Sequence, residues 1–197
     1  MAVGLEIVRQ LREKTSAGIT DCKEALEESG GNIDKAIDVL RKKGVDTARK
    51  KSGRMTKEGC IESYIHPGSK IGVMIEVNCE TDFVAKNEEF RKLVKDLLLQ
   101  IAASNPLYIR KEDVPSDLIE KEKELLSAQI KDKPANVVEK IVSGRLEKFY
   151  QDICLLEQPF VKDPKSTVRA YITSVIAKTG ENIVARRFVR YQLGEEV

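Results

Sequence analysis

Three short amphipathic helices are predicted in residues 1–46, because apolar residues recur there every three or four positions. Gly30 and Gly31 separate the second helix from the third, Asn32 is placed to cap the third, and Gly44 is expected to end it. The apolar positions that define the three faces are Leu5, Val8, Leu11, Ala25, Leu26, Ile33, Ala36, Ile37 and Leu40. The segment therefore predicts a compact three-helix domain.

Residues 47–57 are polar and basic, with Arg49, Lys50, Lys51 and Arg54 close together. We interpret them as a linker, helical at its start, between the three-helix domain and the rest of the chain. The three-helix domain itself resembles the ubiquitin-associated fold. The alternative is a nucleic-acid or membrane-surface patch. The linker interpretation is favoured, because the cluster is short and contains no aromatic residue.

A period of two replaces the helical period after the linker. Apolar and polar residues alternate over Ile61–His66 and again over Ile71–Asn78, and Pro67–Ser69 supplies a turn between them. This alternation predicts a β-hairpin. The β-rich, basic segment Ile183–Gln192 is expected to add a third strand.

Helices are predicted between the hairpin and the last strand. Asn87 is placed to cap a long helix that carries Phe90, Leu93, Val94, Leu97, Leu98 and Ile101. Residues 115–150 predict two helices that meet at a corner over Lys131–Pro134 and form a projecting helical hairpin. A last helix is expected over Lys165–Lys178. Residues 58–197 thus predict an α+β core and dimerisation domain, in which a small antiparallel sheet packs with helices.

Composition narrows the function classes. The chain has 197 residues, of which 41% are hydrophobic, and 34 Lys and Arg against 32 Asp and Glu leave a net charge of +2. A dedicated nucleic-acid binder usually has a more lopsided charge, so no direct nucleic-acid contact is expected. The N-terminus has no signal-peptide pattern, and no apolar stretch is long enough to span a bilayer. We expect a cytoplasmic protein that does not bind membranes.

The sequence offers few residues that could catalyse a reaction or bind a cofactor. His66 is the one histidine, the four cysteines form no C-x-x-C pair, and neither G-x-x-x-x-G-K-[ST] nor G-x-G-x-x-G occurs. A general base, a metal site or a nucleotide cradle would therefore lack its usual residues. We expect neither an enzyme nor a bound metal or cofactor.

Five ordered motifs resemble the elongation factor Ts family along nearly the whole chain. They are L-R-E-K-T-x-A-G (Leu11–Gly18), D-C-K-E-A-L (Asp21–Leu26), G-V-M-I-E-V-N-C-E-T-D-F-V-A-K (Gly72–Lys86), L-L-E-Q-P-F-V-K-D (Leu155–Asp163) and K-T-G-E-N-I (Lys178–Ile183). Each motif is moderately specific, and the ordered set is highly specific. The resemblance implies a guanine nucleotide exchange factor in translation elongation whose partner is elongation factor Tu.

The same resemblance implies a mechanism for the segment Thr81, Asp82, Phe83 and Val84. Phe83 would wedge between helices of the partner, and Asp82 would hold the loop and disturb the surroundings of the partner's Mg²⁺. Loss of Mg²⁺ removes charge neutralisation at the β-phosphate of GDP, so GDP leaves faster. The competing interpretation is purely structural, with Asp82 as a helix cap and Phe83 in the local core.

Further contact positions are implied by the resemblance in the N-terminal domain, the hairpin and the L-L-E-Q-P-F-V-K-D motif. Many family members have two methionines where this chain has Ile19 and Thr20, so that contact is expected to be weaker or shifted. Core packing is the alternative for Ile19 and Phe160, and plain exposure is the alternative for His66. The implied contact residues are Arg12, Ile19, Thr20, Lys23, His66, Phe160, Val161 and Lys162.

The length of the chain bears on assembly. Longer members of the family carry two related core subdomains and this chain has room for one, so the resemblance implies a non-covalent homodimer. A sheet of three short strands also has an edge that needs covering. The rival functions are an RNA- or ribosome-associated protein, which would explain the basic segments, and a ubiquitin-associated type module, which would explain the first domain alone.

Overall fold

The computed structural model describes residues 4–15, 17–130 and 134–196. Contacts divide the chain into two units, each assembled from three stretches. Unit 1 comprises Met1–Cys60, Val77–Leu93 and Ala170–Val184, and unit 2 comprises Ile61–Glu76, Val94–Arg169 and Ala185–Val197. Within the described ranges no helix is both long and apolar enough to cross a membrane.

The three predicted N-terminal helices are present in unit 1. They are α1 (Leu5–Thr15), α2 (Ile19–Glu28) and α3 (Ile33–Lys51). Asn32 caps α3 as predicted, since its side chain accepts a hydrogen bond of 3.0 Å from the Lys35 N–H. The shared core consists of Val8, Leu11, Cys22, Ala25, Leu26 and Ala36. The apolar periodicity therefore identified the buried faces, except at Leu5, where the prediction is wrong because this side chain is 88% exposed.

The prediction that Gly44 ends the third helix is wrong, because α3 continues through it to Lys51. Gly44 is buried, and a Cβ atom at this position would lie 3.4 Å from the Cβ of Ala177. Ala177 belongs to α8 (Val168–Thr179), whose residues from Ala170 lie in unit 1. A Cβ atom would make only an ordinary van der Waals contact there, so Gly44 is a buried helical position packed beside α8, which a local pattern cannot distinguish from a stop signal.

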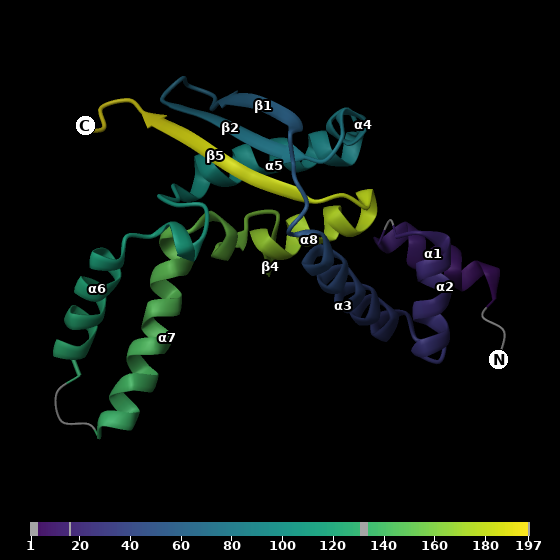
Figure 1. The fold of residues 1–197 in the computed structure, drawn as a ribbon, viewed down its shortest axis with the longest axis horizontal. Helices are drawn as coiled ribbons and strands as arrows, with labels where there is room; N and C mark the ends of the chain where they lie inside the picture. Colours follow the sequence, from purple (N-terminus) through teal and green to yellow (C-terminus); the bar gives the residue numbers. More distant parts are fainter. Residues whose placement is uncertain (1–3, 16, 131–133, 197) are drawn as a thin grey trace. The chain divides into compact units, whose positions relative to one another are not determined.

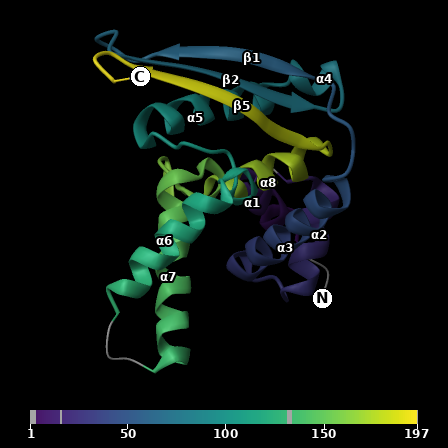
Figure 2. The same ribbon diagram turned by 60° about the vertical axis from the view of Figure 1, so that its left-hand side comes forward.

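A three-stranded sheet in the order β1-β2-β5 contributes to both units (Figure 1). The strands are β1 (Glu58–Ile65), β2 (Ile71–Cys79) and β5 (Ile183–Gln192), and they confirm the predicted hairpin and third strand. The helix α5 (Glu88–Ser104) follows one face of this sheet (Figures 1 and 2). The large buried apolar side chains of β2 and α5 include Val73, Ile75, Val77, Phe90, Leu93, Val94, Leu97, Leu98 and Ile101.

Unit 2 contains the predicted helical hairpin. Its helices, α6 (Ser116–Ala128) and α7 (Ala135–Ile153), lie side by side (Figure 1). Of the expected corner, Lys131–Lys133 lie outside the described residues. The short 3-10 helices η1 (Lys111–Asp113) and η2 (Leu155–Glu157) flank the base of the hairpin in the sequence.

The start of the last helix differs from the prediction. Residues expected to open it form β4 (Asp163–Thr167), which pairs with β3 (Pro159–Phe160) in a second, two-stranded sheet. The helix α8 therefore begins at Val168 rather than at Lys165. Asp163–Thr167 shows no apolar alternation, so its strand conformation depends on pairing with β3 rather than on a pattern visible in the sequence.

Candidate functional site: a braced turn that exposes a phenylalanine

The T-D-F-V segment forms a single helical turn, α4 (Asp82–Ala85), directly after β2. Thr81 is its N-cap, and the Thr81 Oγ1 accepts a hydrogen bond of 3.4 Å from the Val84 N–H. Val84 and Ala85 are buried and anchor the turn. Phe83 is 81% exposed, so the interpretation of this ring as part of the local core is wrong.

Asp82 also points to solvent, in the first turn of α4 rather than at its cap. Its carboxylate accepts a hydrogen bond of 2.7 Å from the Lys86 Nζ. This bond to Lys86 lowers the pKa of Asp82 below its usual value, so the carboxylate stays ionised at neutral pH. The turn therefore presents an aromatic ring and a negative charge side by side.

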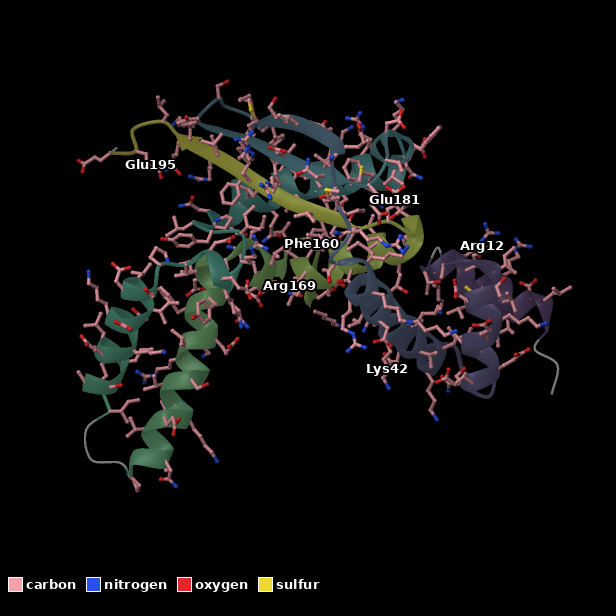
Figure 3. All side chains as sticks on the ribbon, in the orientation of Figure 1. Arg12, Lys42, Phe160, Arg169, Glu181 and Glu195 are labelled. Carbon is pink, nitrogen blue, oxygen red and sulfur yellow. The ribbon has the colours of Figure 1, made fainter. Side chains whose placement is uncertain are left out.

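Glu181, in the loop before β5, holds the entrance to this turn (Figure 3). One of its carboxylate oxygens accepts hydrogen bonds from the Glu80 N–H (3.1 Å) and the Thr81 N–H (3.0 Å). The other oxygen accepts one of 2.6 Å from the Thr81 hydroxyl. Sequence reasoning did not select Glu181 as a site residue, although it lies in the K-T-G-E-N-I motif.

In a second set of hydrogen bonds, Asn182, the residue after Glu181, is the donor. The Asn182 N–H donates to the Glu80 carboxylate over 2.7 Å, and this bond is the main reason that the pKa of Glu80 is lowered. The Asn182 side chain donates to the backbone oxygens of Ser52 (3.4 Å) and Arg54 (3.0 Å). Glu80 and Asn182 thus connect the end of β2 to the residues that follow α3.

Cys79 is buried immediately before the turn. Its thiol donates to the Thr81 backbone oxygen over 3.1 Å. Burial, with a smaller contribution from the negative charge of Glu181, raises the pKa of Cys79 to about 11. The thiol is therefore protonated at neutral pH and acts as a small packing group rather than as a nucleophile.

Three basic residues in the last turn of α3 and just after it make contacts within unit 1. Lys51 donates to the Gly180 backbone oxygen, Arg54 pairs with Glu80 at 3.4 Å, and Arg49 pairs with Asp46 at 3.2 Å. These contacts reduce the positive charge available to a phosphate backbone. The arrangement favours a structural role over the nucleic-acid patch considered from the sequence.

The contact residues expected in the N-terminal domain lie on the surface of α1 and α2. Arg12 on α1 is exposed (Figure 3), as are Thr20 and Lys23 on α2. Ile19, at the first position of α2, is 59% exposed, so the interpretation of Ile19 as a core residue is wrong. All four side chains are therefore accessible to a partner.

The remaining expected contact residues belong to unit 2. His66 is exposed at the end of the hairpin strand, and its Nδ1 lies 3.0 Å from the Tyr64 hydroxyl. Phe160 is buried, as its core interpretation requires, whereas Val161 and Lys162 are exposed. The Lys162 Nζ lies 2.5 Å from the Asp96 carboxylate.

A fully buried amide fixes the Phe160 segment. The Gln100 Nε2 donates to the Gln158 Oε1 (3.0 Å) and to the Pro159 backbone oxygen (3.2 Å), and it also lies 3.0 Å from the Ser104 hydroxyl. The Gln100 Oε1 accepts a hydrogen bond of 2.8 Å from the Val161 N–H. The side-chain amide of Gln100 thus hydrogen-bonds to the backbone on both sides of Phe160.

The described residues contain no group of three or more His, Cys, Asp or Glu side chains that could hold a metal ion. What they do contain is an α+β scaffold with a braced turn whose aromatic and acidic side chains face outward. This arrangement is typical of a protein that acts by contact with a partner.

Comparison with known proteins gives the family. The family model described as "Elongation factor TS" matches residues 3–195. The chain is 60% identical over 196 residues to elongation factor Ts of Thermodesulfovibrio yellowstonii, covering 99% of this chain and 98% of the relative. It is 55% identical over 195 residues to elongation factor Ts of Thermotoga petrophila, with the same coverage of 99% and 98%. The chain belongs to the elongation factor Ts family, and its role is that of a translation elongation factor.

Proposed function

We propose that this protein binds elongation factor Tu in the cytoplasm and accelerates the release of GDP, without itself catalysing a chemical reaction. Phe83 and Asp82 enter the partner near its Mg²⁺ and phosphate site. Weaker Mg²⁺ binding leaves the β-phosphate poorly neutralised, so the nucleotide dissociates and GTP can bind. The coupling is reciprocal, because a factor that weakens GDP binding is itself bound more weakly when GDP is present.

The exposure of Phe83 carries this proposal. An aromatic ring that is 81% exposed has a cost in water that burial at an interface removes. Its backbone is fixed by the Thr81 cap and by the buried side chains of Val84 and Ala85. The ring is therefore pre-organised, and little conformational freedom is lost when it binds.

The test is the release of a fluorescent GDP analogue from purified elongation factor Tu, with the wild type, Phe83→Ala and Leu107→Ala. Leu107 is the matched control, because its side chain is exposed and lies outside the expected contact positions. We expect strong acceleration by the wild type and the control, and a loss of about tenfold or more for Phe83→Ala, as is typical of buried aromatic contacts. No acceleration by the wild type would refute the exchange function.

The alternative function, RNA or ribosome association, is tested in the same preparation. Binding through phosphate contacts weakens steeply as salt is raised. We expect no salt-dependent binding of a labelled RNA, because Lys51, Arg54 and Arg49 are engaged within unit 1. Salt-dependent RNA binding by a wild type that leaves GDP release unchanged would support the alternative instead.

We further propose that the protein is a homodimer. One face of the sheet packs on α5 (Figure 1). Residues that do not face α5 include exposed apolar side chains on all three strands. Such a surface is costly in a monomer and resembles the core of a subunit interface. The exposed apolar residues are Ile61, Ile65, Met74, Val189 and Tyr191.

Light scattering coupled to size-exclusion chromatography tests the dimer. We expect the mass of a dimer for the wild type and of a monomer for Met74→Lys, because a cation in an apolar interface would be desolvated without a partner. Val45→Lys places the same charge on an exposed apolar position of α3 and serves as control. A wild type that is monomeric at micromolar concentration would refute the dimer and leave the exchange function to its own test.

A further inference from the structure

The turn that carries Phe83 is too short to be stable alone. The helix α4 has four residues, and a single helical turn in water is strongly disfavoured by the entropy of fixing its backbone. Phe83 contributes little to order, since its ring is exposed. The conformation that presents the ring must therefore be imposed by contacts outside α4.

Glu181 supplies contacts of the strongest kind available there. Its carboxylate accepts two backbone N–H groups and one hydroxyl group from Glu80 and Thr81, which lead directly into the turn. Hydrogen bonds to an ionised carboxylate are stronger than bonds between neutral groups. The Thr81 hydroxyl held by Glu181 is also the group that caps α4, so its orientation reaches the Val84 N–H directly.

The residue next to Glu181 is held in part by groups outside the turn. Asn182 is buried, its N–H is bound by the Glu80 carboxylate, and its side-chain amide is bound by the backbone oxygens of Ser52 and Arg54. The hydrogen bonds of Asn182 therefore restrain the backbone at Glu181, which does not move easily with the turn. This makes the carboxylate a fixed point against which the turn is held.

We propose that Glu181 is a positioning residue for exchange, which holds the Thr81–Ala85 turn in the conformation that offers Phe83 to the partner. The inference rests on the proposed function. Without the carboxylate, Phe83 samples several orientations, and the partner must select one of them at a cost in binding free energy. Glu181 need not touch the partner to have this effect.

The test compares GDP release by Glu181→Ala, Glu181→Gln and Glu89→Ala. Glu89 is the matched control, because its carboxylate pairs with Lys178 over 3.0 Å instead of with the turn. A glutamine can keep all three contacts: its oxygen accepts both N–H groups, and its NH₂ group donates to the Thr81 hydroxyl oxygen. We expect a roughly tenfold loss for Glu181→Ala, a smaller loss for Glu181→Gln, whose bonds are kept but are no longer charge-assisted, and wild-type exchange for Glu89→Ala.

A double-mutant cycle separates positioning from general damage. In a Phe83→Ala background, Glu181→Ala should cause no further loss, because the group that it orients is already absent. Hydrogen exchange at the amides of Glu80–Lys86 should accelerate in Glu181→Ala, while the amides of the α1–α3 core stay protected. Both results together support the positioning role.

The outcomes that overturn the inference differ from those that overturn the function. If the wild type and Glu181→Ala accelerate GDP release equally, the proposed function stands and the positioning role of Glu181 is refuted. A further loss of the same size in the Phe83→Ala background shows damage unrelated to the ring, and also removes it. A wild type that does not accelerate release overturns the proposed function and the positioning role together.

Discussion

Replacing Gln100 by leucine should destabilise unit 2 without creating a cavity. Leucine has nearly the same volume as glutamine, so the substitution isolates the polar contribution of the side chain. Gln100 is fully buried and bonds to Gln158, Pro159 and Val161. Leucine can replace none of these bonds.

The magnitude follows from the groups left behind. The Gln158 Oε1 belongs to a buried side chain and would lose its donor, which costs about 1–3 kcal/mol. The bonds to the Pro159 oxygen and the Val161 N–H contribute about 0.5–1.5 kcal/mol each. Their sum predicts that the free energy of unfolding falls by roughly 4 kcal/mol, within a range of about 2–6 kcal/mol.

Urea unfolding followed by circular dichroism measures this loss. Gln151→Leu is the control, because it makes the same exchange at an exposed position of α7 and should change stability by less than about 0.5 kcal/mol. A Gln100→Leu protein as stable as the control would show that the buried amide network contributes no net stability. The inference that Gln100 fixes the Phe160 segment would then have to be abandoned.

Two further predictions concern unit 1 and the thiols. Gly59→Ala should lower the free energy of unfolding by at least ~2 kcal/mol, because φ is +140° and the new Cβ would lie 2.1 Å from the Val77 backbone oxygen. Urea unfolding measures this loss, and unchanged stability would contradict the geometry. Burial raises the pKa of Cys79 and Cys154 to about 11 from 9.0, so both thiols favour the folded state while protonated. This stability is complete below pH 9 and is lost as the pH rises toward 11, by about 1.4 kcal/mol per pH unit for each thiol. The free energy of unfolding at pH 8 and pH 10 should therefore differ less in Cys79→Ala than in the wild type, and an equal difference would refute the assignment.

Local patterns predicted the elements whose residues alternate or repeat strongly. Ile183–Gln192 is the third strand with the bounds expected from its sequence, and the buried face of α5 contains the six apolar residues expected there. Such patterns succeed because the position of a residue within the repeat of its strand or helix determines whether it faces the core.

Features that depend on distant parts of the chain were not predictable in this way. Gly44 looked like a helix stop, because the local sequence does not show that this position is buried beside Ala177 of α8 and that the helix continues through it. Glu181 braces Thr81 across 100 residues of sequence, and no local period records that contact. The exposure of Phe83 was likewise ambiguous, since an aromatic residue beside a turn packs inward as readily as outward. The family resemblance favoured the exposed interpretation, and the periodicity alone did not.

The discontinuous make-up of unit 1 has a consequence for biosynthesis. Its last stretch, Ala170–Val184, is translated long after its first two, because the 76 intervening residues, Val94–Arg169, take roughly 4–15 s at ordinary elongation rates. During that interval the nascent chain has made Phe83 but lacks Glu181 and Asn182. A truncated product of an interrupted ribosome would therefore carry the aromatic side chain without its brace. The hydrogen-bonded form of the turn is available only from chains that have been translated as far as Asn182.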